Sequence, residues 1–303
     1  MTMTGRVKEL SMAWRTTLVT GAVCLFSSQA RADDTIMWLL PDFAPAALPV
    51  DGKPSYGIVD QMVLYLSANW VKSEHTFMFA NAKRIWTMLG SDIKACHAGA
   101  LVTKERRKIA YFTLTNLAPP LQLVIREDKF GTLKLNAEGE VNLKQLFANQ
   151  SLRGILVEQR SFGEAIDGAI RSRAAASGLA VIAPNNYGGN ILKLLSMGQG
   201  DYTIEYDFAV GYQLSQNRAL ANLRTVPIEG SSALMPVGIA CPRTAWGRAT
   251  IEHIDQIVGT RAGAEAMYKA AAAWSTPAAR AHYGKEIDRF TESRMHPANP
   301  ADF

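Results

Sequence analysis

Residue types that bind metals or act as nucleophiles are scarce in this sequence of 303 residues, which has three cysteines and five histidines. The histidines are scattered without the spacing of a metal site. Cys96 and His97 are neighbours on an expected strand, so their side chains point to opposite faces. The sequence also lacks a G-x-S-x-G elbow, a phosphate-binding P-loop, a dinucleotide fingerprint and an H-E-x-x-H helix. We therefore expect neither a metal nor a cofactor.

The sequence has no apolar run long enough for a stable membrane span. Its N-terminus has three basic residues before a mainly apolar stretch at 16–26 and an A-x-A sequence at 30–32. This order predicts a secretory signal peptide over residues 1–32 and a soluble periplasmic protein, with an anchored helix as the alternative. Cys24 follows a valine, which is a poor residue before a lipidated cysteine.

A large excess of one charge is also absent once this leader is removed. The whole chain has 32 basic and 27 acidic residues, hence a net charge of +5. The leader carries four basic residues and one acidic residue, so 28 basic and 26 acidic residues remain and the net charge falls to +2. This near-neutral balance gives no reason to expect nucleic acid or an anionic membrane as a partner.

Two cysteines remain after the leader, Cys96 and Cys241. In an oxidising compartment a pair of cysteines forms a disulfide more often than a metal site. We predict this disulfide, which would close a long loop and contribute about 5 kcal/mol in the chain-entropy model.

Strand and helix patterns alternate through the first part of the mature chain. Continuous apolar runs predict buried strands, and apolar residues at helical spacing predict helices between them. The expected strands cover residues 36–40, 75–79, 93–98 and 109–112, and the expected helices cover residues 58–70 and 84–89. The alternation predicts an α/β fold with a parallel sheet and right-handed crossovers.

The pattern restarts after an extended segment at 119–126, which begins with two prolines and indicates a crossover into a second lobe. A second apolar segment at 234–240 indicates the return. Between them we expect strands at 152–157, 179–183, 202–206 and 223–228, helices at 161–173 and 190–197, and a surface loop at 127–142. Three helical patterns follow, then a tail from His296 that we expect to be frayed. The predicted lobes are 33–118 with 231–303, and 119–230.

The segment 96–107 contains the most informative turn. An apolar run enters a turn of small residues, and Thr103 is placed to cap a short helix with Arg106 in its first turn. Cations at a helix N-terminus oppose its dipole, so an anionic partner is needed. Two interpretations stay open: a solvated charged turn, or a guanidinium that awaits a carboxylate. Phe43 follows the first strand in a stiff loop, where open α/β sheets bind ligands, or it only packs within the loop.

Two further segments allow a functional and a structural interpretation. Glu205 and Asp207 flank Tyr206 at a strand end, where a carboxylate serves as a base or a ligand unless it is only solvated. The glycine pair at 188–189 either binds an anion or forms a bare turn.

The order of these features resembles the periplasmic solute-binding proteins of amino-acid ABC transporters. The similarity covers nearly all of the mature chain, but only the Thr-x-x-Arg turn with its flanks is specific, and the rest is order and spacing. The matching segments are Pro-Asp-Phe-Ala-Pro at 41–45, Tyr-Gly-Ile-Val-Asp at 56–60, Thr-Lys-Glu-Arg at 103–106, Phe-Thr at 112–113, Leu-Arg-Gly-Ile-Leu-Val at 152–157, Leu-Ser-Met-Gly-Gln-Gly-Asp at 195–201 and Val-Gly-Ile-Ala at 237–240. The resemblance implies a type II two-lobed fold, each lobe a mostly parallel sheet flanked by helices.

In that family the arginine of the turn binds the α-carboxylate of the ligand, a role that falls here on Arg106, next to Thr103. The loop aromatic that packs on the ligand corresponds to Phe43. The turn of the second lobe that touches the ligand corresponds to Arg160, Ser161 and Phe162.

This chain departs from the family at two points. The acidic residue that takes the α-amino group falls on Tyr206, and the neighbouring Glu205 would face the other side of the strand. The hydroxyl residues that often precede the turn are replaced by Gly99 and Leu101. Both departures speak against an ordinary α-amino acid as the ligand.

The resemblance implies a monomeric solute-binding protein, not an enzyme, that closes around a small carboxylate or amino-acid-like solute. Its expected partner is an ABC permease or another membrane protein, and its expected hinge lies near residues 119 and 230. One alternative is a periplasmic enzyme of the cyclohexadienyl dehydratase type, with Glu205 as general acid or base. The other is an accessory or sensory module for a separate partner.

Overall fold

The computed structural model describes residues 1–2, 35–91, 93–174 and 177–303. The chain divides into two units, residues 1–32 and 33–303, and every described helix and strand belongs to the second. Residues 3–32 of the predicted signal peptide, Cys24 included, lie outside the described residues. No helix in the described part of the chain has both the length and the apolar character needed to cross a membrane.

Ten strands form two five-stranded sheets among the described residues. The first sheet has the order β2-β1-β3-β10-β4, and the second has the order β7-β6-β8-β5-β9. The strands of the first sheet are β1 (Ile36–Pro41), β2 (His75–Ala80), β3 (Ala95–Leu101), β4 (Ala110–Ala118) and β10 (Met235–Pro242). Those of the second are β5 (Gln122–Arg126), β6 (Gly154–Val157), β7 (Leu179–Ile182), β8 (Tyr202–Glu205) and β9 (Leu223–Val226).

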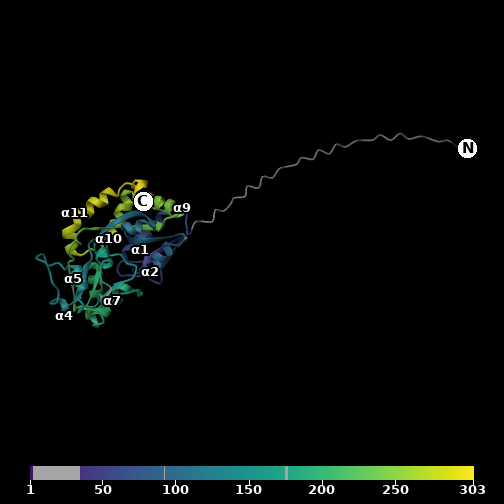
Figure 1. Ribbon diagram of the computed structural model, residues 1–303. Coiled ribbons are helices and arrows are strands. Elements are labelled where there is room, and N and C mark those ends of the chain that lie inside the picture. The colour runs from purple at the N-terminus through teal and green to yellow at the C-terminus, as the bar shows by residue number, and fades with distance from the viewer. Residues whose placement is uncertain (3–34, 92, 175–176) are drawn as a thin grey trace. The chain divides into compact units, whose positions relative to one another are not determined.

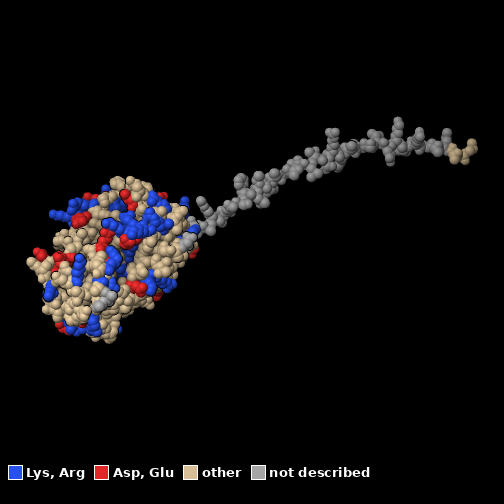
Figure 2. All heavy atoms as spheres, viewed as in Figure 1, with Lys and Arg blue, Asp and Glu red and all other residues tan. Residues whose placement is uncertain are grey.

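Helices cover both sheets, and we call each sheet with its helices a lobe (Figure 1). The first lobe has α1 (Ile58–Asn69), α2 (Ala82–Leu89), α3 (Lys104–Arg107), α9 (Ala245–Val258), α10 (Arg261–Ala272) and α11 (Pro277–Ser293). The second has α4 (Glu127–Phe130), α5 (Leu143–Ala148), α6 (Glu164–Arg171), α7 (Tyr187–Ser196) and α8 (Asp207–Gln216). Two short 3₁₀ turns, Arg218–Leu220 and Pro300–Asp302, complete the list. On the face in Figure 2, Lys and Arg lie among Asp and Glu, in keeping with the small net charge.

Each sheet is mixed, where the sequence predicts mostly parallel sheets. The first three strands in each order pair in parallel, as predicted, and the remaining pairings are antiparallel. The crossover strands explain the difference. β10 returns from the second lobe and inserts between β3 and β4, and β5 inserts between β8 and β9, so each runs against both of its neighbours.

Other predicted boundaries change for local reasons. The strand predicted at 109–112 continues to Ala118, and the loop predicted at 127–142 begins with α4. The helix predicted from Ser161 begins instead at Glu164, because Gly163 has a left-handed φ of 93° and breaks the segment before it. The tail expected to be frayed is held by the Ala298 amide, which donates to the Asp255 carboxylate at 2.7 Å.

The predicted disulfide between Cys96 and Cys241 is confirmed. It joins β3 to its antiparallel neighbour β10 inside the apolar core of the first lobe. The adjacent Gly99 has a φ of 80°, and an added Cβ would lie 2.4 Å from Val59. Glycine is therefore required at position 99 by backbone conformation and packing.

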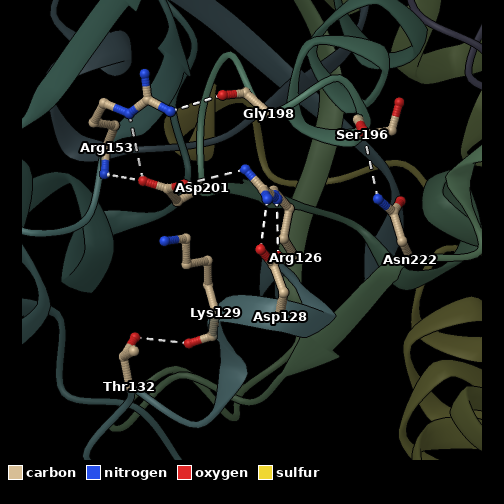
Figure 3. Close-up of polar contacts among 9 residues, drawn as sticks. All are labelled: Arg126, Asp128, Lys129, Thr132, Arg153, Ser196, Gly198, Asp201 and Asn222. Atoms are coloured by element: carbon tan, nitrogen blue, oxygen red, sulfur yellow. Dashed lines mark hydrogen bonds and ion pairs between the residues drawn. The ribbon is translucent and has the colours of Figure 1, made fainter.

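Asp201 fixes the start of β8 (Figure 3). It accepts the Arg153 amide at 2.8 Å and forms ion pairs with the guanidinium groups of Arg153 and Arg126 at 3.6 and 3.5 Å. These contacts tie β8 to β6 and β5. Because β8 is only four residues long, the network also fixes Glu205 at its other end, opposite Gln122 just after the crossover.

Candidate functional site

A cavity of about 170 Å³ lies between the two lobes. This space is well above the roughly 10–15 Å³ that one water molecule needs. Its walls are mostly apolar, from Phe43, Val59, Met62, Ile85 and Trp86. Its polar lining residues in the region of the predicted site are His97, Arg106, Arg160, Ser161, Tyr187 and Tyr206.

Arg106 reaches this cavity from α3. Thr103 caps that helix, as predicted, by accepting the Arg106 amide at 3.2 Å. The guanidinium lies over the Trp86 ring at 4.1 Å and donates to the carbonyls of Leu101 at 3.0 Å and Gln159 at 3.3 Å. Thr103 itself lines a neighbouring groove instead of the cavity.

The guanidinium of Arg106 has N–H donors that are not used in hydrogen bonds to the described residues. Burial lowers its pKa to about 10, so it stays charged at neutral pH. It forms no ion pair with a carboxylate of the described residues, and three of its five N–H groups have no acceptor among them. A half-buried cation with free donors is suited to receive an anion.

Arg160 is paired, in contrast to Arg106. It donates to both carboxylate oxygens of Glu205, at 2.6 and 2.5 Å, and both side chains are buried. Burial opposes the charge on Arg160, but the ion pair with Glu205 outweighs it and raises the pKa of the guanidinium above its usual range. Glu205 therefore does not face the ligand space as a free acid, as the enzyme alternative requires.

Four aromatic rings surround the Arg160 guanidinium. Its central carbon lies 4.9 to 5.6 Å from the ring centroids of Phe43, Phe162, Tyr187 and Tyr206. Such cation–π contacts are strengthened by burial. Burial also raises the pKa of Tyr206 to about 12, so its hydroxyl is neutral at pH 7. The ring cluster and the ion pair hold Arg160 in place.

The turn after β6 is also satisfied internally. The Ser161 hydroxyl donates to Asp167 at 2.5 Å, and the Phe162 amide donates to the same carboxylate at 2.8 Å. Ser161 lines the cavity, whereas Phe162 packs into the core of the second lobe. Asp167 was not identified from the sequence, although its position six residues after Ser161 is within reach of the turn.

Phe43 connects the lobes directly. Its ring stacks on Tyr187 at 5.1 Å with an interplanar angle of 3°. Next to it, the Asp42 carboxylate accepts the Asn186 amide at 2.6 Å. The glycine pair at 188–189 thus lies in the first turn of α7, where Gly188 packs against Phe43 and Gly189 faces Gln213.

Two strained residues supply groups to the interface between the lobes. Gln159 and Asn186 are non-glycine residues with positive φ, 61° and 42°. The carbonyl of Gln159 accepts from Arg106, and the amide of Asn186 donates to Asp42. Left-handed conformations of such residues cost free energy and persist where the surroundings fix them.

His97 and Trp86 complete the site and were not predicted to be part of it. The Nδ1 atom of His97 lies 2.9 Å from the Leu39 carbonyl, and its ring meets Trp86 edge-on at 5.8 Å. Burial of the ring lowers the pKa of His97 to about 4. The hydrogen bond to Leu39 acts in the opposite direction, and the positive charge of Arg106 lowers the pKa further. His97 is therefore neutral at pH 7. Within the described residues, no three His, Cys, Asp or Glu side chains are grouped to hold a metal ion.

Comparisons with known proteins identify the fold. No protein-family model and no curated protein sequence matches the chain. Solved structures do match it. One is a histidine kinase sensor domain with similarity to periplasmic binding proteins, with a TM-score of 0.61 and 16% identity over 80% of this chain and 95% of that one.

Two other matches have similar values. An ancestral arginine-binding protein bound to arginine gives a TM-score of 0.60 at 16% identity, covering 80% of this chain and 98% of that one. A second structure is concerned with glutathione import through GshT and the cystine ABC importer TcyBC of Streptococcus mutans. It matches with a TM-score of 0.60 at 12% identity, covering 89% of this chain and 100% of that one. The two-lobed periplasmic-binding-protein fold expected from the sequence is confirmed.

Proposed function

We propose that this chain is a periplasmic solute-binding protein that holds a small carboxylate between its lobes. Arg106 carries the proposal, because it is a half-buried cation that lines the cavity, has donors free and forms no ion pair with a carboxylate of the described residues. A carboxylate would accept from it in bidentate fashion, the geometry for which arginine is suited. Phe43 and Trp86 would pack on the body of the solute.

The similarity in fold to proteins of ABC importers supports an ABC permease as the partner. The sensor domain among the structural matches supports the second candidate, a sensory module for a separate partner. Both candidates need the same ligand site. The enzyme alternative has less support, because both oxygens of Glu205 are engaged by Arg160, and the Tyr206 amide also donates to that carboxylate at 2.8 Å.

The test is a thermal-shift screen of organic acids and amino acids, followed by calorimetric titration of the compounds that raise the melting temperature. Arg106→Ala is expected to weaken the binding of a carboxylate by roughly 2–5 kcal/mol. Lys104→Ala is the matched control, because Lys104 lies in the same short helix but is exposed. Equal binding by wild type and Arg106→Ala would contradict the assignment of the carboxylate to Arg106.

A further inference from the structure

We propose that the cleft selects small carboxylates that carry a hydroxyl group and no ammonium group, with the carboxylate on Arg106 and the hydroxyl on Nε2 of His97. This inference rests on the proposed function and narrows it to one class of solute, the hydroxycarboxylates. It follows from two features of the site: Glu205 is already paired with Arg160, and Nε2 of His97 has no hydrogen-bond partner among the described residues.

Beside the aromatic rings, the described residues leave no buried carboxylate free to pair with an ammonium group. Glu205 is buried and bound through both oxygens to Arg160, which in turn lies among the four rings. An α-amino acid would have to displace this guanidinium or bring its own charge next to it. Breaking a buried ion pair leaves one charge without compensation, which is strongly unfavourable.

The other acids near the cavity are placed differently. Asp207 accepts the Phe208 amide at 2.7 Å and the Thr276 hydroxyl at 2.8 Å, and so is tied to the start of α11. Asp288 lines the cavity from the exposed surface of α11. Asp167 accepts from Ser161 and Phe162 in the neighbouring groove. None of these three carboxylates is paired with Arg160 among the aromatic rings as Glu205 is, so none replaces Glu205 as a partner for an ammonium group there.

His97 offers a hydrogen-bond acceptor. A backbone carbonyl can only accept, so the 2.9 Å contact with Leu39 places the proton of the neutral imidazole on Nδ1. Nε2 then carries a lone pair. It has no hydrogen-bond partner among the described residues, although His97 is only 6% exposed and lines the cavity. Nε2 is not fully enclosed but open to the cavity, so a ligand that donates to it takes the place of water and gains about the value of one neutral hydrogen bond.

Both polar groups line the same cavity and neighbour the same side chain, Trp86. The Arg106 guanidinium lies over the face of the Trp86 indole at 4.1 Å, and the His97 ring is nearly perpendicular to the same indole, with the two ring centroids 5.8 Å apart. The walls beside them are apolar, with Val59, Met62 and Ile85. The arrangement fits a ligand with three parts: a carboxylate that binds Arg106, a neutral hydrogen-bond donor that binds His97, and an apolar body that packs on the walls.

Matched sets of compounds test this directly by calorimetric titration. The first set is 2-hydroxybutyrate, 3-hydroxybutyrate, butyrate and 2-aminobutyrate. The second is 3-phenyllactate, 3-phenylpropionate and phenylalanine. Within a set that binds, we expect a hydroxy acid to bind roughly 3- to 10-fold more tightly than the unsubstituted acid, the value of one neutral hydrogen bond. The amino acid should bind at least about 100-fold more weakly than the hydroxy acid.

The variant His97→Asn separates the hydroxyl contact from folding. Its amide nitrogen can keep the bond to the Leu39 carbonyl, but nothing replaces Nε2. We expect the advantage of the hydroxy acid to disappear while the affinity for the unsubstituted acid stays within about two-fold of wild type. A hydroxy-acid advantage that survives in this variant would overturn the role of His97.

Arg160→Met tests the exclusion of the ammonium group, because it frees Glu205. We expect it to gain affinity for the amino acids, and the control Arg160→Met/Glu205→Gln not to. If Arg160→Met does not fold, the wild-type titrations decide the question. Amino acids that bind wild type as tightly as hydroxy acids, with binding lost in Arg106→Ala, would overturn this inference and leave the proposed function intact. Binding of no carboxylate would overturn both.

Discussion

At the scale of single residues, the site contains two guanidinium groups, from Arg160 and Arg106, that have opposite roles. Arg160 is neutralised by Glu205 and enclosed by aromatic rings, so it acts as part of the wall. Arg106 donates only to backbone carbonyls. A partly desolvated charge without an ion pair is less stable than a paired one. The second guanidinium is therefore the one that an anionic solute would stabilise.

The first prediction concerns His97 and the pH dependence of stability. Its pKa is about 4 in the folded protein, against 6.5 ordinarily, because the ring is buried. Between these values the unfolded chain binds more protons, so the contribution of His97 to stability is complete above pH 6.5 and is lost as the pH falls towards 4. The loss amounts to about 3 kcal/mol. Urea unfolding of wild type and His97→Asn from pH 4 to 7 measures it.

The difference between the two proteins isolates this effect, because the acidic residues titrate equally in both. Wild type should lose more stability than His97→Asn over this range. Parallel pH profiles would show that His97 titrates in the folded state as it does in the unfolded chain.

The site could be predicted from the sequence only where a motif or a strand end marked the residue. Arg106 and Phe43 were identified because one follows a helix cap and the other follows a strand. His97 and Trp86 gave no such signal, since their roles depend on β3 and α2 packing side by side. The pairing of Arg160 with Glu205 joins residues 45 apart in the sequence and needs the register of β6 and β8.

At the scale of elements, a buried polar network attaches α9 and α11 to β4. Asp255 of α9 accepts from Arg294 at 2.5 Å and from the Thr113 hydroxyl at 2.6 Å. Arg294, just after α11, also donates to the Leu114 carbonyl at 3.1 Å. The C-terminal helices are thereby fixed to the sheet that carries the disulfide.

The second prediction is that Asp255→Ala destabilises the protein by about 3–5 kcal/mol, because it leaves Arg294 buried without its counterion. Glu252→Ala is the control on the same helix. Its ion pair with Arg248, at 2.7 Å, is partly exposed and contributes about 1 kcal/mol or less. Urea unfolding compares the two variants, and equal losses would contradict the structural role of the network.

Most helices and strands could be predicted from the spacing of apolar residues, but the pairing of the strands within each sheet could not. The strands at 36–40 and 75–79 match β1 and β2 closely, because the first is a continuous apolar run and the second has three consecutive apolar residues at 77–79. The start of α6 was wrong by three residues because the left-handed Gly163 interrupts a segment that otherwise has helical spacing. Antiparallel insertion of β10 depends on the direction of the returning chain, which a run of apolar residues does not reveal.

At the scale of the whole unit from residue 33 onward, the lobes are in contact across the cavity. The Phe43–Tyr187 stack and the Asp42–Asn186 bond lie at the centre of this contact. Exposed ion pairs, Lys83 with Glu158 and Lys104 with Glu164, lie at its edge. Exposed pairs contribute little, so the aromatic stack contributes most to the contact between the lobes.

The third prediction is that Gly188→Ala weakens this contact. An added Cβ would lie 2.6 Å from Cδ2 of Phe43, so the ring must move away from Tyr187, at a cost of about 1–3 kcal/mol. Gly189→Ala is the matched control in the same helical turn, because its Cβ would meet only the flexible end of Gln213. We expect Gly188→Ala alone to raise the radius of gyration in small-angle scattering. An unchanged radius would contradict the importance of the stack.

The crystal structure of the protein with the tightest-binding carboxylate from the titrations is the most direct test of the central claim. We predict both carboxylate oxygens within hydrogen-bond distance of the Arg106 guanidinium, with the solute packed on Trp86 and Arg160 still bound to Glu205. A carboxylate bound elsewhere, with Arg106 contacting only the Leu101 and Gln159 carbonyls, would contradict the account.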